Sequence, residues 1–133
     1  MPPRRKVSAE ARRWVTERAH HRCSYCRSPD WIGIPMVMEH AIPLVAGGAT
    51  DIHNLCLACY RCNEFKGAHT HGRDPMSDTN VPLFNPCKQA WRDHFVWSKA
   101  GLHVIGLSAS GRATIEALHL NNEWLVHARR IWL

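Results

Sequence analysis

Two Cys-x-x-Cys pairs constrain this chain more than any other feature of its sequence. They are Cys23/Cys26 and Cys59/Cys62, and 32 residues separate them. Each turn of this kind presents two thiolates to one ion, and four thiolates in a tetrahedron are a preferred structural site for Zn²⁺. The pattern therefore predicts one structural zinc ion that links residue 23 to residue 62 and stiffens the small domain between them.

Two alternatives compete with this interpretation of the cysteines. Cys56 stands three residues before Cys59, so a Cys56/Cys59 pair could replace Cys59/Cys62. A redox dithiol would need one of the pairs at the start of a helix in a thioredoxin-like βαβ context, and the sequence does not show that context. We favour zinc held by Cys59 and Cys62, which leaves Asn63 beside the metal, and we treat Cys56 and Cys87 as buried or half-exposed thiols.

Size and composition place the chain among folded globular proteins. Its 133 residues, 45% hydrophobic and 21% charged, fit one functional unit and argue against disorder. The apolar runs are too short to cross a membrane, and the basic start lacks the apolar core of a signal peptide. We therefore expect a cytoplasmic protein whose six cysteines are ligands or free thiols rather than disulfides.

The positive charge is concentrated near the start of the chain. The formal net charge is +6, and residues 1–22 alone carry +5 of it. A basic arm suits contact with a phosphate backbone, where each neutralised phosphate releases a counterion. The alternative is a solvated helix face with no partner.

Hydrophobic spacing and turn residues predict an α+β protein. The first half is predicted to have a mobile Pro- and Arg-rich start at residues 1–7, a helix over residues 9–22 capped by Ser8, strands at residues 36–42 and 54–58, and a helix over residues 60–67. The second half is predicted to begin with a linker or surface loop at residues 69–80. A hairpin of residues 94–97 and 101–108 follows, and then helical sequence from residue 111 that breaks near residues 121–122. The second half is thus an extension of hairpin and helix.

Polar residues of a second kind lie between the cysteine pairs. Glu39 and His40 are adjacent, Asn54 follows after 13 residues, and Asn63 follows after 8 more. A histidine can accept a proton from water near neutral pH, and carboxylate and amide oxygens are ligands that suit Mg²⁺ or Mn²⁺. The whole pattern, EH-x-x-P…GG…N-L…C-x-x-C-N-x-x-K-G, resembles the HNH endonuclease family in its variant with Asn at the third motif position.

The resemblance implies a ββα-metal fold, in which a hairpin and a helix clasp one divalent ion. It implies that His40 is the general base that activates water, and that Glu39 and Asn63 bind catalytic Mg²⁺ or Mn²⁺, with Ni²⁺ as a further candidate. It implies that Asn54 ties the long loop and orients His40. The candidate contacts to nucleic acid are Lys66, at the Lys position of the motif, together with Arg12, Arg13 and Arg61.

The C-terminal half carries a looser resemblance. Its pattern PLFNP…HF.W…GL…GRATI…L.LN is similar to that of a group of stand-alone HNH proteins. That group leads us to expect Arg after FNP, and this chain has Cys87 there, so a phosphate contact would have to come from Lys88 or Arg92. His94 is an additional candidate site residue without an assigned role.

The expected organisation has three parts: a basic arm and helix at residues 1–22, an HNH core stapled by the four-cysteine zinc site at residues 23–68, and an extension packed on that core at residues 69–133. The expected function is metal-dependent cleavage of DNA, by nicking or by double-strand breaks. The alternative is a zinc-ribbon module that binds nucleic acid without cutting it. Glu39, His40 and Asn63 separate the two, because a pure binder has no need of them.

Overall fold

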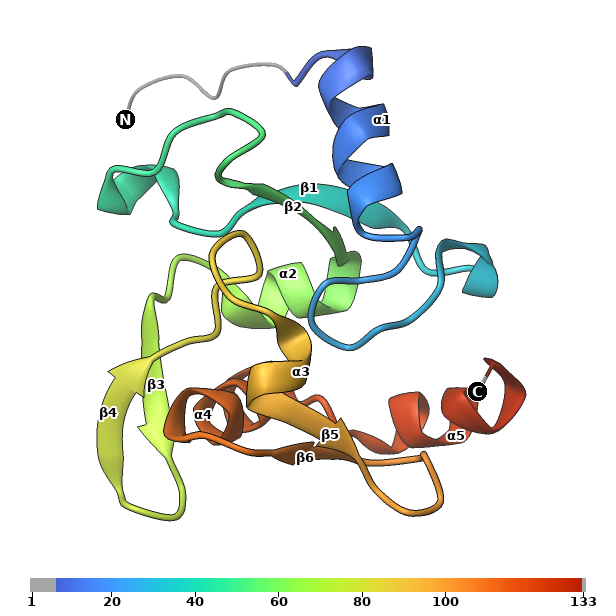
Figure 1. The fold of residues 1–133 in the computed structure, drawn as a ribbon, viewed down its shortest axis with the longest axis vertical. Helices are drawn as coiled ribbons and strands as arrows, with labels where there is room; N and C mark the ends of the chain where they lie inside the picture. Colours follow the sequence, from blue (N-terminus) through green and yellow to red (C-terminus); the bar gives the residue numbers. More distant parts are fainter. Residues whose placement is uncertain (1–6, 133) are drawn as a thin grey trace. The chain divides into compact units, whose positions relative to one another are not determined.

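The computed structural model describes residues 7–132 of the chain (Figure 1). The prediction of a mobile start falls almost wholly on residues 1–6, which lie outside the described residues. Within the described range the chain forms two compact units. The first extends to Ala68 and includes Asn85–Lys88, and the second comprises His69–Phe84 and the chain from Gln89 onward. No described helix combines the length and apolar character needed to span a membrane.

The first unit begins with helix α1 (Ala9–Arg18). Its predicted cap is confirmed, because the Ser8 hydroxyl accepts a hydrogen bond from the Ala11 N–H at 3.1 Å. Val15 is fully buried and packs with two leucines of a strand, Leu55 and Leu57. The helix ends at Arg18, earlier than predicted, since His20 and His21 adopt positive φ angles that a helix cannot continue through.

An antiparallel pair of strands and one helix form the centre of the first unit. Strands β1 (Met36–His40) and β2 (Leu55–Cys59) pair with Met36 opposite Cys59 and His40 opposite Leu55, and α2 (Tyr60–Lys66) follows β2 directly (Figure 1). The expected ββα arrangement is confirmed. Two short 3₁₀ turns, η1 (Asp30–Ile32) and η2 (Leu44–Ala46), lie on either side of β1 in the sequence.

Strand β2 is buried at all five positions, whereas β1 is buried only at its last two. Side chains alternate between the faces of a strand, so Leu55 and Leu57 share the face that packs on α1, and Cys56 points to the other. Helix α2 contacts both strands. A strand covered on both faces has no polar side, which explains the continuous apolar sequence LCLAC.

The second unit contains a hairpin that the sequence interpretation missed. Strands β3 (His71–Asp74) and β4 (Thr79–Pro82) are antiparallel partners, so the prediction of a linker or surface loop over residues 69–80 is wrong. Helix α4 (Ala109–Leu118) packs on both strands, and buried Asp74 accepts hydrogen bonds from Ser77 in the turn and from Arg112 in that helix. These tertiary contacts outweigh the low strand propensity of the segment.

The rest of the second unit contains the predicted hairpin and C-terminal helices, together with one short helix that was not predicted. Helix α3 (Trp91–His94) leads into the hairpin of β5 (Phe95–Trp97) and β6 (Val104–Gly106), and helices α4 (Ala109–Leu118) and α5 (Glu123–Trp132) complete the chain. The expected break between the helices is confirmed. Asn121 bonds to both backbone groups of Val104, and the Asn122 side chain accepts from the Leu125 N–H at the start of α5.

Candidate metal centre and active site

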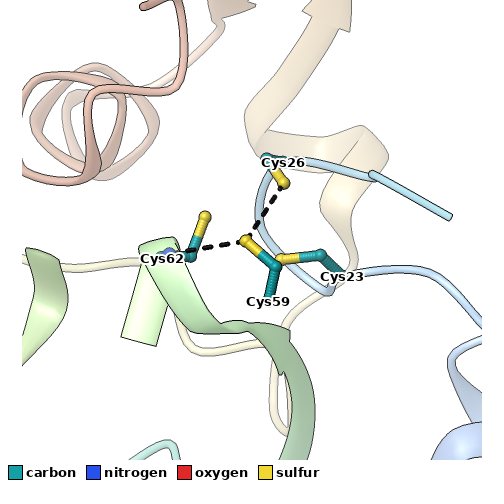
Figure 2. A group of neighbouring side chains, drawn as sticks. All are labelled: Cys23, Cys26, Cys59 and Cys62. Atoms are coloured by element: carbon teal, nitrogen blue, oxygen red, sulfur yellow. Dashed lines mark hydrogen bonds between the residues drawn. The ribbon is translucent and has the colours of Figure 1, made fainter. Parts of the chain in front are cut away.

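The four cysteines of the two pairs meet in the first unit. Their sulfur atoms all lie within 4.8 Å of one another, and all four residues are buried. Figure 2 shows the thiols pointing toward a common centre, with the sulfurs of Cys26 and Cys59 3.8 Å apart. A tetrahedral zinc site with Zn–S bonds of about 2.3 Å places its sulfurs about 3.8 Å apart. The cluster therefore has the composition and the size of a zinc site with four thiolate ligands, and it excludes Cys56.

Local backbone hydrogen bonds shape each half of this cluster. In the first half the Cys23 N–H donates to the Ser28 carbonyl at 2.8 Å, and the turn closes through Arg27, which adopts a φ of 67°. The Ser24 N–H donates to the Leu57 carbonyl at 2.8 Å, which fastens this turn to β2. In the second half Cys59 caps helix α2, and its sulfur accepts from the Cys62 N–H at 3.4 Å (Figure 2).

A buried ion pair lies beside β1. The Lys66 Nζ donates to Glu39 Oε1 at 2.8 Å and to the carbonyl oxygen of Ala41 at 3.0 Å. The Tyr25 hydroxyl donates to the same Oε1 at 2.7 Å. Glu39 is 3% exposed and Lys66 is 2% exposed, so two opposite charges are held almost entirely out of water.

The two carboxylate oxygens of Glu39 differ in their surroundings. Oε1 takes both hydrogen bonds, whereas Oε2 is buried and has no hydrogen-bond partner among the described residues. Burial raises the pKa of the Glu39 carboxyl, and Lys66 acts in the opposite direction. The same burial raises the pKa of Tyr25 well above its usual range, so this phenol is a proton donor to the carboxylate at neutral pH.

His40 ends strand β1 and is also buried. Its Nε2 lies 2.8 Å from the Thr50 hydroxyl oxygen, a contact that restrains the orientation of the ring. The Lys66 ammonium reaches the carbonyl oxygen of His40 at 3.4 Å as well as that of Ala41. The end of the strand is thus held from the loop through Thr50 and from α2 through Lys66.

Asn54 closes the long loop between the strands. Its side-chain oxygen accepts from the Ile42 N–H at 2.9 Å, and its side-chain nitrogen donates to the carbonyls of Ile42 and Ala49, each at 2.9 Å. Gly48 allows this closure, because a Cβ at that position would lie 1.8 Å from the Ile42 carbonyl oxygen. Asn54 therefore determines the path of the loop that carries Thr50 to His40.

The remaining predicted site residues are distributed over the two helices of this unit and beyond it. Asn63 is half-buried in α2, directly after Cys62 and one turn before Lys66. Arg12 and Arg13 are exposed on α1, and Arg61 is half-buried in α2. Lys66 is an interior residue in this arrangement, so a contact between Lys66 and phosphate, which stays a prediction, would require the ammonium to leave Glu39. His94 belongs to the second unit, where its Nδ1 is 2.7 Å from the hydroxyl that caps α4.

Sequence reasoning missed two residues of this site, Tyr25 and Thr50. Tyr25 lies inside the first cysteine pair. A large aromatic residue between two predicted zinc ligands could have been noticed as a residue that packs into the interior beside the metal. Thr50 is the residue before Asp51 in the loop sequence GGATD, where nothing distinguishes it from an ordinary turn residue. Only the fold brings it to His40.

Comparison with known proteins identifies the same stretch of chain. Residues 23–69 match the family model described as HNH endonuclease. The chain is also 25% identical over 128 residues to the Septu protein PtuB of Bacillus thuringiensis, which covers 88% of this chain and 44% of that protein. The chain therefore spans less than half the length of this curated relative, and no solved structure matches it significantly. The ββα arrangement, the cysteine cluster and the family match agree that residues 23–69 carry a domain of the HNH endonuclease family.

Proposed function

We propose that this protein is a metal-dependent endonuclease that hydrolyses phosphodiester bonds in DNA. The observation that carries the proposal is the end of β1, where His40 is oriented by Thr50 and lies next to a buried carboxylate with one unpartnered oxygen. In a segment that matches the HNH family, these are a candidate base and a candidate metal ligand on adjacent residues.

The HNH family implies a divalent ion, and the residues present fit one. The unpartnered Oε2 of Glu39 is a buried anionic acceptor, which is the kind of atom that a cation satisfies. Glu39 and Asn63 would hold the ion, because a carboxylate and an amide oxygen suit Mg²⁺ or Mn²⁺. When bound, the ion would supply charge stabilisation for the phosphate and the departing 3′ oxygen.

His40 would take the proton from the attacking water. An imidazole nitrogen in its neutral form accepts a proton from water, which is the chemistry that a general base requires. Thr50 restrains the ring at Nε2, and the hydrogen bond from the Asn54 side chain to the carbonyl of Ala49 keeps the neighbouring Thr50 in place. Such positioning is a large part of what a general base needs.

The basic residues of the first unit would contact the DNA backbone. Arg12 and Arg13 are exposed on α1 and, with Arg61, offer positive charge without any need to break an internal ion pair. Contacts of this kind provide affinity that falls with salt and carry little sequence information. The four-cysteine cluster would hold a structural zinc ion, because four buried thiolates leave no open position for a substrate.

One observation favours a second function, a module that binds nucleic acid without cutting it. Lys66 already neutralises Glu39, and an internal counter-ion of this kind weakens the attraction of a carboxylate for a divalent cation. A pure binder would retain the zinc cluster and the basic helix α1 and would not depend on His40.

A supercoiled-plasmid assay separates the two functions. The zinc-loaded protein is incubated with plasmid and Mg²⁺, Mn²⁺ or Ni²⁺, and His40→Ala is compared with His53→Ala, which removes an exposed histidine from the same unit. We expect metal-dependent nicking or linearisation by the wild type and His53→Ala, and a loss of about 10²–10⁴-fold in His40→Ala.

Two results would contradict the enzyme assignment. One is the absence of cutting by the wild type with every metal, and the other is full activity of His40→Ala. Retention of plasmid in a gel-shift experiment with no cutting would instead support the binding module.

A further inference from the structure

We propose that Arg18, the last residue of helix α1, binds a phosphate of the DNA backbone beside the candidate base His40. This assignment rests on the proposed function and adds a residue to it, because Arg18 is not among the arginines that the sequence suggested as DNA contacts. Three observations support it: the backbone groups that hold the guanidinium, the face of the strand pair on which His40 lies, and the contact of the guanidinium with Trp14.

Two hydrogen bonds place the Arg18 guanidinium at the end of the strand pair. Its Nη1 donates to the Ile52 carbonyl at 2.8 Å, and its Nη2 donates to the Leu55 carbonyl at 2.5 Å. Ile52 belongs to the loop that carries Thr50, and Leu55 is the partner of His40 in the register of β1 and β2. The Cα atoms of directly opposite residues in antiparallel strands are about 4.5–5.5 Å apart. The guanidinium is therefore fixed to the backbone directly across from the candidate base.

The same register determines the face on which His40 lies. Directly opposite residues of an antiparallel pair have their side chains on the same face of the sheet. Leu55 packs with Val15 of α1, so His40 lies on the face that α1 covers. Glu39 precedes it by one position and is directed to the other face, toward α2. A phosphate at the end of β1 would then be held by the ion from the side of α2 and by Arg18 from the side of α1.

Trp14 holds the guanidinium in a defined orientation. It lies one helical turn before Arg18, and the Arg18 Cζ is 4.8 Å from the centroid of its ring. A guanidinium that rests on an aromatic face is restrained there, while its N–H groups point outward from its edge. Because a guanidinium has five N–H donors, it can bind two carbonyls and a phosphate oxygen at the same time. Arg18 therefore has both a fixed position and the donor capacity that a phosphate site requires.

The charge and exposure of Arg18 fit an anionic partner. Both backbone acceptors are neutral carbonyls, so these bonds do not cancel the positive charge of the guanidinium. Arg18 is exposed, as are Arg12 and Arg13 on the same helix, and residues 1–22 carry +5 of the net charge of +6. The alternative is an arginine that only clamps the loop to the strand. A clamp and a phosphate contact differ in their response to salt, because only the phosphate contact releases a counterion from the DNA.

The direct test is the salt dependence of DNA binding, which needs no cleavage. Fluorescence anisotropy measures the affinity of the zinc-loaded protein for a labelled duplex of about 20 base pairs at about 50–200 mM NaCl, without any other divalent ion. Arg18→Gln should bind several-fold more weakly and should lower the slope of log affinity against log salt by about 0.9, the contribution of one phosphate. Arg18→Lys keeps the charge and should keep the slope. The control Arg130→Gln, which removes an exposed arginine of the second unit, should change neither quantity.

Plasmid cleavage tests whether the contact is beside the reaction. At saturating DNA, Arg18→Gln and Arg18→Lys should both lower kcat about tenfold or more, because an ammonium does not reproduce the fork of a guanidinium at the phosphate. Arg13→Gln, on the same helix, should act chiefly on KM. Footprinting of the wild type with phenylglyoxal gives a measurement that needs no variant. Bound duplex should protect Arg18 from modification and leave Arg130 reactive.

The assignment of Arg18 is overturned if the wild type binds the duplex and Arg18→Gln, folded by circular dichroism, has the same salt slope. Equal modification of Arg18 with and without DNA would overturn it as well, even if the variants fold poorly. These results would leave the proposed nuclease intact. A wild type that binds the duplex but cuts with no metal would contradict the nuclease, and the salt slope and the footprint would still decide the role of Arg18. A wild type that does not bind DNA would contradict both.

Discussion

The ion pair between Lys66 and Glu39 gives the most demanding prediction about this fold. The change is Lys66→Met, which keeps the length of the apolar stem and removes the ammonium. In the structure that ammonium is the positive partner of Glu39 Oε1 at 2.8 Å and also donates to two backbone carbonyls at the end of β1. After the substitution, Glu39 would remain buried and would keep only the Tyr25 hydroxyl.

The magnitude follows from the geometry. Coulomb's law with an effective dielectric constant of about 20 gives roughly 6 kcal/mol of attraction between unit charges at the 2.8 Å separation. Part of this loss is recovered because the Glu39 carboxyl can take up a proton instead of remaining charged. A decrease of about 3–5 kcal/mol in the free energy of unfolding remains, as is typical when one partner of a buried pair is removed.

Urea unfolding followed by circular dichroism measures this decrease by linear extrapolation. The matched control is Lys88→Met, which removes an exposed lysine from the same unit and should change the free energy of unfolding by less than about 0.5 kcal/mol. The double variant Glu39→Gln with Lys66→Met should be more stable than the sum of the single effects predicts, by about 2–3 kcal/mol. The reasoning fails if Lys66→Met unfolds within about 1 kcal/mol of the wild type, or if the two substitutions are additive.

Three further predictions concern the cluster, the candidate base and the second unit. Metal analysis should find about one tightly held zinc per chain, and chelation or Cys59→Ser should release it and lower the thermal midpoint steeply; a folded, zinc-free wild type would contradict this. Thr50→Val should lower kcat for plasmid cleavage roughly two- to tenfold with little change in KM, because one hydrogen bond to His40 is lost. Thr50→Ser, which keeps the hydroxyl, should restore kcat. An unchanged kcat in Thr50→Val would exclude a positioning role. The hydrogen bonds from Arg112 and Ser77 lower the pKa of Asp74 well below its usual range, so its stabilising contribution is complete above the unfolded-state pKa of about 3.9 and is lost as the pH falls through the folded-state value. The difference in thermal midpoint between the wild type and Asp74→Asn should therefore be largest near neutral pH and shrink in acid, and a difference that grows in acid would show that the sign is wrong.

The local structure of the first unit could be predicted from the sequence, because its caps and turns depend on residues that are close together in the chain. The cap at Ser8, the two cysteine turns and the stop of α2 at Gly67 each depend on residues within a few positions of one another. The break between α4 and α5 was equally predictable, since paired asparagines interrupt a helical pattern. For such features the intrinsic preference of the residues agrees with the final structure.

Features that depend on partners distant in sequence were not accessible in the same way. The hairpin of β3 and β4 has the composition of a loop, and helix α4, about 40 residues later, makes it a stable element. The burial of Lys66 is similar, because a lysine near the end of a short helix is ordinarily solvated. It becomes an interior residue here because Glu39 arrives from β1 at the same place. Hydrophobic spacing carries no information about such pairings.

Each residue of strand β2, and Asn54 before it, has a different structural role. Asn54 closes the loop, Leu55 and Leu57 pack with Val15 of α1, Cys56 lies against the Tyr25 hydroxyl, and Cys59 belongs to the metal cluster. A strand with one solvent face tolerates replacement at every second position, and this one has no such face. In a library of all single substitutions, this stretch should therefore form an unbroken block of intolerant positions, each failing for a different reason. The evolution of the domain would then be constrained at every position of this segment, rather than at alternate positions.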